Sequence, residues 1–148
     1  MSRAAADARC GGHRQTVECR PVTLHLRVDR STIGAGRGVF ATRPIARGEV
    51  VETCPMLVVD DEQGDALSIG AEGYVFGWGD GATALALGYG SLYNHSFTPN
   101  ATTLERSDEL VITALRDIAA GDEIFINYTG TGTDATDLWF EDESTRHV

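Results

Sequence analysis

The sequence is built from short apolar runs that Gly, Pro and Asp separate, and no segment has the period of a long, capped amphipathic helix. The clearest run, 22–28, alternates apolar and polar residues, which is typical of a strand with one buried face. Further β-rich runs lie at 38–41, 50–51, 56–59, 84–87, 110–114 and 124–126. Seventeen glycines indicate many tight turns. The pattern therefore predicts a mainly β fold with little helix.

Length and patterning favour a single folded domain. The chain has 148 residues, the usual size of one domain rather than two. Residues 1–20 show no helical or strand period, so we expect a mobile arm there, one domain over 21–128 and an acidic tail over 129–148. No apolar run approaches the roughly 18 residues of a membrane span, and no N-terminal signal pattern is seen. We expect a cytoplasmic protein with no membrane partner.

The charges are distributed asymmetrically along the chain. All twelve basic residues are arginines, so the sequence has no lysine. Residues 1–47 hold nine arginines against three acids, whereas residues 48–148 hold three arginines against 19 acids, and the formal net charge is −10. An acidic surface repels phosphate backbones and attracts cationic partners. We therefore expect a basic protein as partner and no direct nucleic-acid binding, with plain solvation of an acidic surface as the alternative.

The three cysteines, Cys10, Cys19 and Cys54, exclude a complete disulfide framework because their number is odd. They form no Cys-x-x-Cys pair, and no histidine pair has the spacing of metal ligands. We expect reduced, partly buried thiols and no structural metal.

Two segments of similar sequence predict one turn used twice. Residues 43–49 (RPIARGE) resemble residues 116–122 (RDIAAGD). In each, an isoleucine can enter the core, a glycine supplies a permissive turn position, and an acid leads into the next strand. Seven residues are too few for a repeat architecture. We interpret the segments as two equivalent changes of strand direction.

Three glycine-rich or polar segments are candidates for a functional site. The first, 34–41, superficially resembles a dinucleotide loop, but a strand pattern follows it, which leaves a plain turn or a loop that binds a ligand through its backbone. The second, 88–101, places an Asn-His pair before a Pro-Asn turn, and such groups need one another or a ligand when buried. The third, 121–128, is a strand whose polar end carries Tyr128, as a core or interface ring or as a catalyst.

The order of these segments resembles a known family. G-x-G-V-F-A at 36–41, N-H-S-x-x-P-N at 94–100 and G-D-E-I-x-x-x-Y at 121–128 are similar to motifs of the SET-domain protein-lysine methyltransferases. The resemblance runs from about residue 22 to Tyr128. It implies short twisted β-sheets around a C-terminal pseudoknot, in which the segment that ends at Tyr128 lies beside 94–100. It also implies S-adenosyl-L-methionine as the cofactor.

Carried over residue by residue, the resemblance implies a set of site residues. Tyr128 would be the catalytic residue, orienting the incoming amine beside the sulfonium. The residues that would bind the cofactor are Gly36, Arg37, Gly38, Asn94, His95 and Tyr128. Trp139 would stack over the adenine, with a simple anchor for the tail as the alternative. The residues that would line the substrate channel are Tyr74, Tyr89 and Ile126. The substrate would be the side-chain amine of lysine in a basic, histone-like protein.

The chain departs from the family pattern at several points. Ser91 stands where relatives often have an arginine, three residues before the Asn of the motif. Ile126 stands where many relatives have Phe or Tyr, and because Ile has no hydroxyl to hold a water, it favours multiple methylation. The cysteine-rich zinc segment that follows the tyrosine in many relatives is absent here. The resemblance therefore implies a minimal, stand-alone SET domain, and the arginine-only composition suits a GC-rich bacterial genome.

Two other functions fit the same residues. One is a non-catalytic module of the same fold that binds S-adenosylmethionine or a basic peptide. The other is a methyltransferase for small amines, for which we expect a more enclosed channel. A monomer and a homodimer fit the sequence equally.

Overall fold

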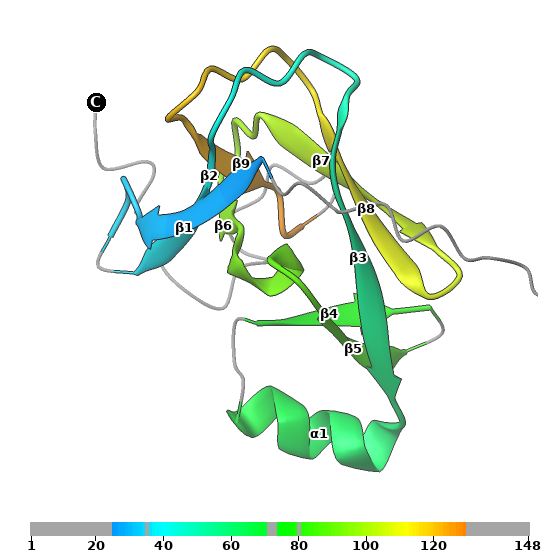
Figure 1. Ribbon diagram of the computed structural model, residues 1–148. Helices are drawn as coiled ribbons and strands as arrows, with labels where there is room; N and C mark the ends of the chain where they lie inside the picture. The colour runs from blue at the N-terminus through cyan, green and yellow to red at the C-terminus, as the bar shows by residue number, and fades with distance from the viewer. Residues whose placement is uncertain (1–24, 35, 71–73, 80, 130–148) are drawn as a thin grey trace, which may run out of the picture.

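The computed structural model describes residues 25–34, 36–70, 74–79 and 81–129 (Figure 1). In this part of the chain the strands form two sheets. The smaller sheet has the order β1-β2-β9-β6, with β1 at Leu26–Arg30, β2 at Arg37–Ala41, β9 at Glu123–Ile126 and β6 at Asn94–His95. The predicted mainly β fold is confirmed. The predicted arm at 1–20 and residues 130–148 of the predicted tail lie outside the described residues.

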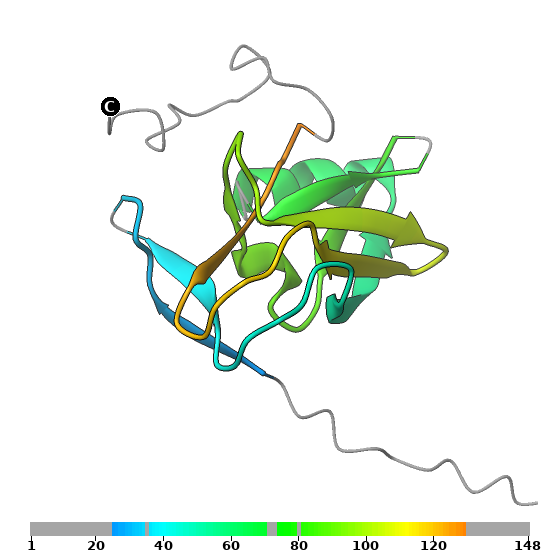
Figure 2. The same cartoon turned by 90° about the horizontal axis from the view of Figure 1, so that it is seen from above.

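The larger sheet carries the helices. Its strand order is β4-β5-β3-β8-β7, with β4 at Val75–Trp78, β5 at Ala82–Ala86, β3 at Val50–Val59, β8 at Glu109–Ala114 and β7 at Ala101–Arg106. Helix α1 spans Asp61–Gly70 and lies beneath β4 and β5 in Figure 1, and a short 3₁₀ helix, η1, spans Gly90–Leu92. Seen from above in Figure 2, the blue and cyan β1–β2 pair and the orange β9 lie to one side of the green strands and helix.

Most predicted strands are observed with shifted ends, and two of them merge. The runs at 50–51 and 56–59 belong to the single strand β3. Its residues 50–55 pair with β8 and its residues 56–59 pair with β5, so Pro55 stands where β3 changes its partner. A proline lacks the N–H that a continuous ladder of hydrogen bonds needs, so it destabilises the sheet little at a position where the strand changes its partner. Strand β1 begins at Leu26, and residues 22–24 of the predicted run lie outside the described residues.

Five elements are not predicted by the sequence patterns: β4, β6, β7, α1 and η1. Helix α1 has no continuous apolar stripe, so its sequence lacks the apolar period that would predict a helix. Its start is capped, because Asp60 Oδ1 accepts the N–H of Gln63 at 2.9 Å. Gly64 faces β5 so closely that a Cβ there would lie 2.8 Å from Thr83 Oγ1. Packing of a glycine against the sheet therefore positions this helix.

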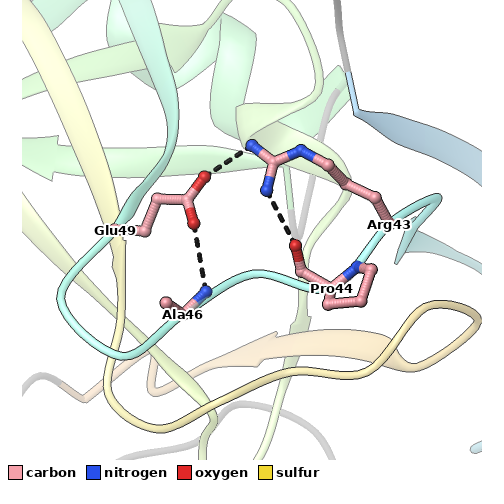
Figure 3. A network of polar contacts seen from close by, with 4 residues as sticks. All are labelled: Arg43, Pro44, Ala46 and Glu49. Atoms are coloured by element: carbon pink, nitrogen blue, oxygen red, sulfur yellow. Dashed lines mark hydrogen bonds and ion pairs between the residues drawn. The ribbon is translucent and has the colours of Figure 1, made fainter.

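The two predicted turns, 43–49 and 116–122, share a hydrogen bond between their acid and the backbone. In the first, a Glu49 carboxylate oxygen accepts the N–H of Ala46 at 3.0 Å, and the other oxygen binds Arg43 (Figure 3). In the second, Asp122 Oδ2 accepts the N–H of Ala119 at 3.1 Å. The acid of each turn thus closes the turn that precedes its strand, which confirms the predicted equivalence.

The two turns also pair with each other. Ile45 and Ile118, at equivalent positions, exchange two backbone hydrogen bonds of 2.9 Å each, and both side chains are buried. Gly48 and Gly121 have φ values of +80° and +93°, which only glycine adopts without strain. The pairing of the turns joins the chain before β3 to the chain before β9.

One cluster of buried apolar side chains joins the two sheets. From the smaller sheet it includes Leu26, Val39, Ala41, Ile124 and Ile126, and from the larger sheet it includes Cys54, Met56, Trp78, Ala84, Leu110, Ile112 and Ala114. The Cys54 thiol is buried and free, while Cys10 and Cys19 lie outside the described residues. Within the described residues, no helix has the length and apolar character needed to cross a membrane.

Candidate active site

Strands β6 and β9 bring two distant motifs side by side. They pair in parallel, with Asn94 opposite Phe125 and His95 opposite Ile126. The pairing continues past the strand end, because the N–H of Ser96 donates to the carbonyl of Ile126 at 2.9 Å. The segment that ends at Tyr128 therefore lies beside the Asn-His-Ser motif, as the resemblance implied.

Tyr128 is fixed at both its backbone and its side chain. Its N–H donates to His95 Nδ1 at 3.1 Å, and its hydroxyl donates to the main-chain carbonyl of Tyr93 at 2.6 Å. The rings of His95 and Tyr128 lie 5.4 Å apart between centroids. The residue keeps 38% of its surface exposed. The phenol donates its only proton to Tyr93, which fixes the orientation of the hydroxyl.

The Tyr128 hydroxyl is a weak acid. Burial, followed by the nearby phenol of Tyr74, raises the pKa of Tyr128 to about 12. At neutral pH this hydroxyl is protonated, so it acts as a hydrogen-bonding group and not as a base. Tyr74 itself is exposed, with an exposed fraction of 46%.

The Asn94 amide ties β6 to the smaller sheet. Its Nδ2 donates to the carbonyl of Arg37 at 2.9 Å and to Glu123 Oε1 at 2.8 Å, with Ser31 Oγ at 3.1 Å. These partners come from β2, β9 and the loop that follows β1. A single half-buried amide therefore holds together three segments that are far apart in sequence.

Glu123 is a buried carboxylate at the centre of this network. It accepts hydrogen bonds from the Ser31 hydroxyl at 2.8 Å and from the N–H and hydroxyl of Thr32 at 2.6 and 2.5 Å, in addition to Asn94. Its exposed fraction is 4%. A Cβ on Gly38 would overlap the Glu123 carboxylate and would lie 3.0 Å from Asn94 Nδ2. Gly38 therefore leaves the space that this carboxylate occupies.

Other predicted site residues occupy different environments. Gly36 and Arg37 are exposed at the start of β2. Tyr89 is half-buried and packs against the core, and Ile126 is buried at 1% exposure. Their roles toward cofactor and substrate stay predictions. Trp139 lies outside the described residues.

The structure adds site residues that the sequence motifs did not mark. Ser31 and Thr32 lie outside every motif. Tyr93 lies within the segment 88–101, but the sequence predicts no separate role for it. Asn100, within the second motif, contacts β9 through two hydrogen bonds of 2.8 Å. Its side-chain NH2 donates to the main-chain carbonyl of Glu123, and its side-chain carbonyl accepts the N–H of Phe125. The position of Asn100 in the motif could have predicted a role for it. The residues around Ser31 and Thr32 form no motif that predicts one.

One departure from the family pattern, Ser91, has a local consequence. Ser91, in place of an arginine, bonds through its hydroxyl to the backbone N–H and carbonyl of Ala86, both at 3.2 Å. It therefore ties η1 to β5. Among the described residues, no cluster of three or more His, Cys, Asp or Glu side chains is arranged to hold a metal ion.

Comparison with known proteins identifies the class to which this fold and site belong. The SET-domain family model matches residues 36–129. The chain belongs to the SET-domain family of protein-lysine methyltransferases, as the three motifs indicated.

Particular relatives share much of the chain. It is 35% identical over 120 residues to the histone-lysine N-methyltransferase of Schizosaccharomyces pombe that is specific for lysine 37 of histone H3, and the match covers 78% of this chain and 77% of that protein. A crystal structure of a candidate histone methyltransferase from Plasmodium falciparum superposes with a TM-score of 0.64 at 29% identity, covering 78% of this chain and all of that one.

Proposed function

We propose that this protein transfers a methyl group from S-adenosylmethionine to the side-chain amine of lysine in a basic, histone-like protein. The observation that carries the proposal is the position of Tyr128, whose hydroxyl is held on the Tyr93 carbonyl directly beside the Asn94-His95 pair. Family membership and the relatives' activity on histones support the same reaction.

The residues around Gly36 fit this cofactor. Gly36 is exposed and a Cβ there would meet nothing within 4 Å, so the backbone of this loop is open to a ligand. Next to it stand the Arg37 main chain and the Asn94 amide, which are joined by a hydrogen bond. Backbone groups and an amide suit the zwitterionic end of an amino-acid ligand. We propose that Gly36, Arg37, Gly38, Asn94 and His95 hold the cofactor, which supplies a methyl group on a sulfonium.

Catalysis by this chain is then mainly alignment. Proximity and orientation alone can lower a barrier by about 7–11 kcal/mol in favourable systems. Tyr128 presents its oxygen to the incoming amine or the transferring methyl group, and its pKa of about 12 keeps it from removing a proton at neutral pH. A lysine ammonium, with a usual pKa of about 10.4, loses its proton more readily when it is desolvated near a positive charge. The exposed ring of Tyr74 is proposed to line the path of the lysine side chain.

The proposed substrate class follows from charge. Asp60, Glu62 and Asp65 are exposed at the start of α1, on the segment that leads to Tyr74. Residues 48–148 carry a large excess of acids. Such a surface raises the local concentration of a lysine-rich, basic protein segment. The chain itself has no lysine, so its own side chains cannot accept the methyl group.

The test is methyl transfer with isotope-labelled S-adenosylmethionine and a panel of histone-like proteins, acidic proteins and small amines. We expect label on lysines of the basic proteins, and we expect Tyr128→Phe to lower kcat about 100-fold, the size typical of losing one preorganised polar contact to a transition state. Thr102→Val, which removes a hydroxyl from an exposed site on β7, serves as the control and should leave the rate unchanged. Cofactor binding without transfer to any protein or small amine would instead assign a non-catalytic module.

A further inference from the structure

A buried carboxylate on β3 contacts the loop that precedes β6. Glu52 has an exposed fraction of 9%, and its side chain points to the core side of the strand. One carboxylate oxygen accepts the Tyr93 hydroxyl at 2.8 Å, and the other accepts the N–H of Tyr89 at 2.9 Å. Glu52 therefore holds both ends of the short segment 89–93, which contains η1.

The loop is shaped around this carboxylate. Gly88 has a φ of +73°, and a Cβ on it would overlap Glu52 Oε1. Within the segment, the N–H of Leu92 donates to the carbonyl of Tyr89 at 2.8 Å, so the turn is closed by its own backbone. A buried carboxylate needs hydrogen-bond donors to offset its desolvation, and the loop supplies two of them.

Tyr93 connects this carboxylate to the candidate catalytic phenol. Its side chain is 1% exposed, and burial together with the charge of Glu52 keeps its pKa well above the usual 10, so its hydroxyl remains a donor. The carbonyl of the same residue accepts the hydroxyl of Tyr128 at 2.6 Å. The position of that carbonyl depends on where the Tyr93 side chain is anchored.

We infer that Glu52 is a positioning residue for methyl transfer: by binding the Tyr93 hydroxyl, it fixes the main-chain carbonyl that orients the Tyr128 hydroxyl. The inference rests on the proposed function of Tyr128. Glu52 acts through Tyr93. It belongs to β3 of the larger sheet, whereas Tyr128 follows β9 of the smaller one, so the interaction couples the two sheets at the active site.

The first test is kinetic. Tyr93→Phe removes one hydroxyl and keeps the ring that packs in the core, so we expect it to fold. We expect its kcat to fall roughly ten- to a hundred-fold, because small displacements of a reacting group have effects of this size. The KM for S-adenosylmethionine should change less than about twofold, since the pairing of β6 with β9 remains.

A matched set of Glu variants tests the carboxylate itself. Glu52→Ala should lower kcat as much as Tyr93→Phe does. Glu52→Gln should recover most of the activity, because its amide oxygen can still accept the N–H of Tyr89 while its NH2 group donates to the Tyr93 hydroxyl oxygen. Glu49→Gln makes the same chemical change three residues away, in the exposed turn of Figure 3, and should leave kcat unchanged.

The second test reads the position of the phenol without any reaction. The ring ¹³C signal of Tyr128, assigned by its loss in Tyr128→Phe, should in Tyr93→Phe move toward that of a solvated tyrosine and titrate at lower pH than the native pKa of about 12. Glu49→Gln should leave the signal in place.

The two tests separate the possible results. A lower kcat together with a moved Tyr128 signal supports the inference. An unmoved signal in Tyr93→Phe overturns it, whether kcat is unchanged or falls only in proportion to the folded fraction. If the native protein transfers no methyl group, the proposed function fails, and the signal of Tyr128 still decides whether Glu52 positions the phenol.

Discussion

Two buried carboxylates, Glu123 and Glu52, support the candidate active site through different partners. Glu123 accepts hydrogen bonds from Ser31, Thr32 and Asn94, none of which titrates. Glu52 instead accepts the hydroxyl of a phenol, Tyr93, whose pKa is raised by burial and then by the charge of Glu52. Among the described residues the two ion pairs, Arg27–Asp29 and Arg43–Glu49, lie elsewhere. Both acids are thus stabilised by hydrogen-bond donors and not by a cation.

The two carboxylates belong to hydrogen-bond networks that differ in their partners and in what disturbs them. The Glu123 network joins a loop, β2 and β6 on the side proposed for the cofactor, and all of its partners have short side chains. The Glu52 network reaches from the core to the phenol and includes groups that ionise at high pH. The first network is therefore sensitive to changes in volume, and the second is sensitive to alkaline pH.

Loss of the Glu123 carboxylate should have the largest effect of the substitutions considered. Glu123→Ala leaves several buried donors without their acceptor, so we expect a loss of about 3 kcal/mol in the free energy of unfolding. Urea denaturation measures this loss. Glu123→Gln keeps the volume and one acceptor, and it should lose less. Equal losses for the two variants would show that the retained volume and single acceptor contribute nothing, and that the loss of the carboxylate accounts for the whole effect.

An added methyl group at Gly38 should have an intermediate effect. Gly38→Ala pushes the Glu123 carboxylate away from its donors, and we expect a loss of about 2 kcal/mol and weaker binding of S-adenosylmethionine in calorimetry. Gly36→Ala is the matched control, because a Cβ there would meet nothing within 4 Å. If Gly36→Ala destabilised the fold as much as Gly38→Ala, the overlap with Glu123 would not be the cause.

Alkaline pH should affect the Glu52 side of the site alone. Burial, and then the charge of Glu52, raises the pKa of the Cys54 thiol from 9.0 to about 12. Above pH 9 the unfolded thiol ionises and the folded one does not, so stability falls as the pH rises through this window toward 12. From pH 8 to pH 10 this thiol should lower the free energy of unfolding by about 1.4 kcal/mol.

The Cys54→Ala variant isolates this contribution. It lacks the thiol, so its free energy of unfolding should decline less than that of the native protein between pH 8 and pH 10. The tyrosines begin to contribute only above about pH 10. Parallel curves for the two proteins would mean that the folded thiol ionises as freely as the unfolded one.

Some of the fold and site could be predicted from local patterns. The turns at 43–49 and 116–122 were recognised because each contains its own glycine and acid, which act within a few residues. The motifs at 36–41, 94–100 and 121–128 marked the family. Helix α1 and strand β7 could not be predicted, because their contacts with β5 and β8, and not an apolar period, hold them in place.

By itself, the sequence determined most of the strands, the positions of the two turns and the order of the three motifs, since all of these depend on residues that are neighbours along the chain. Only the tertiary structure decided that Tyr128 meets the carbonyl of Tyr93 and that two acids, Glu52 and Glu123, are buried behind the site. The physical reason is distance along the chain. Glu123 binds Ser31 across 92 positions, and such a contact forms only when the whole core closes and brings enough donors together to offset a buried charge.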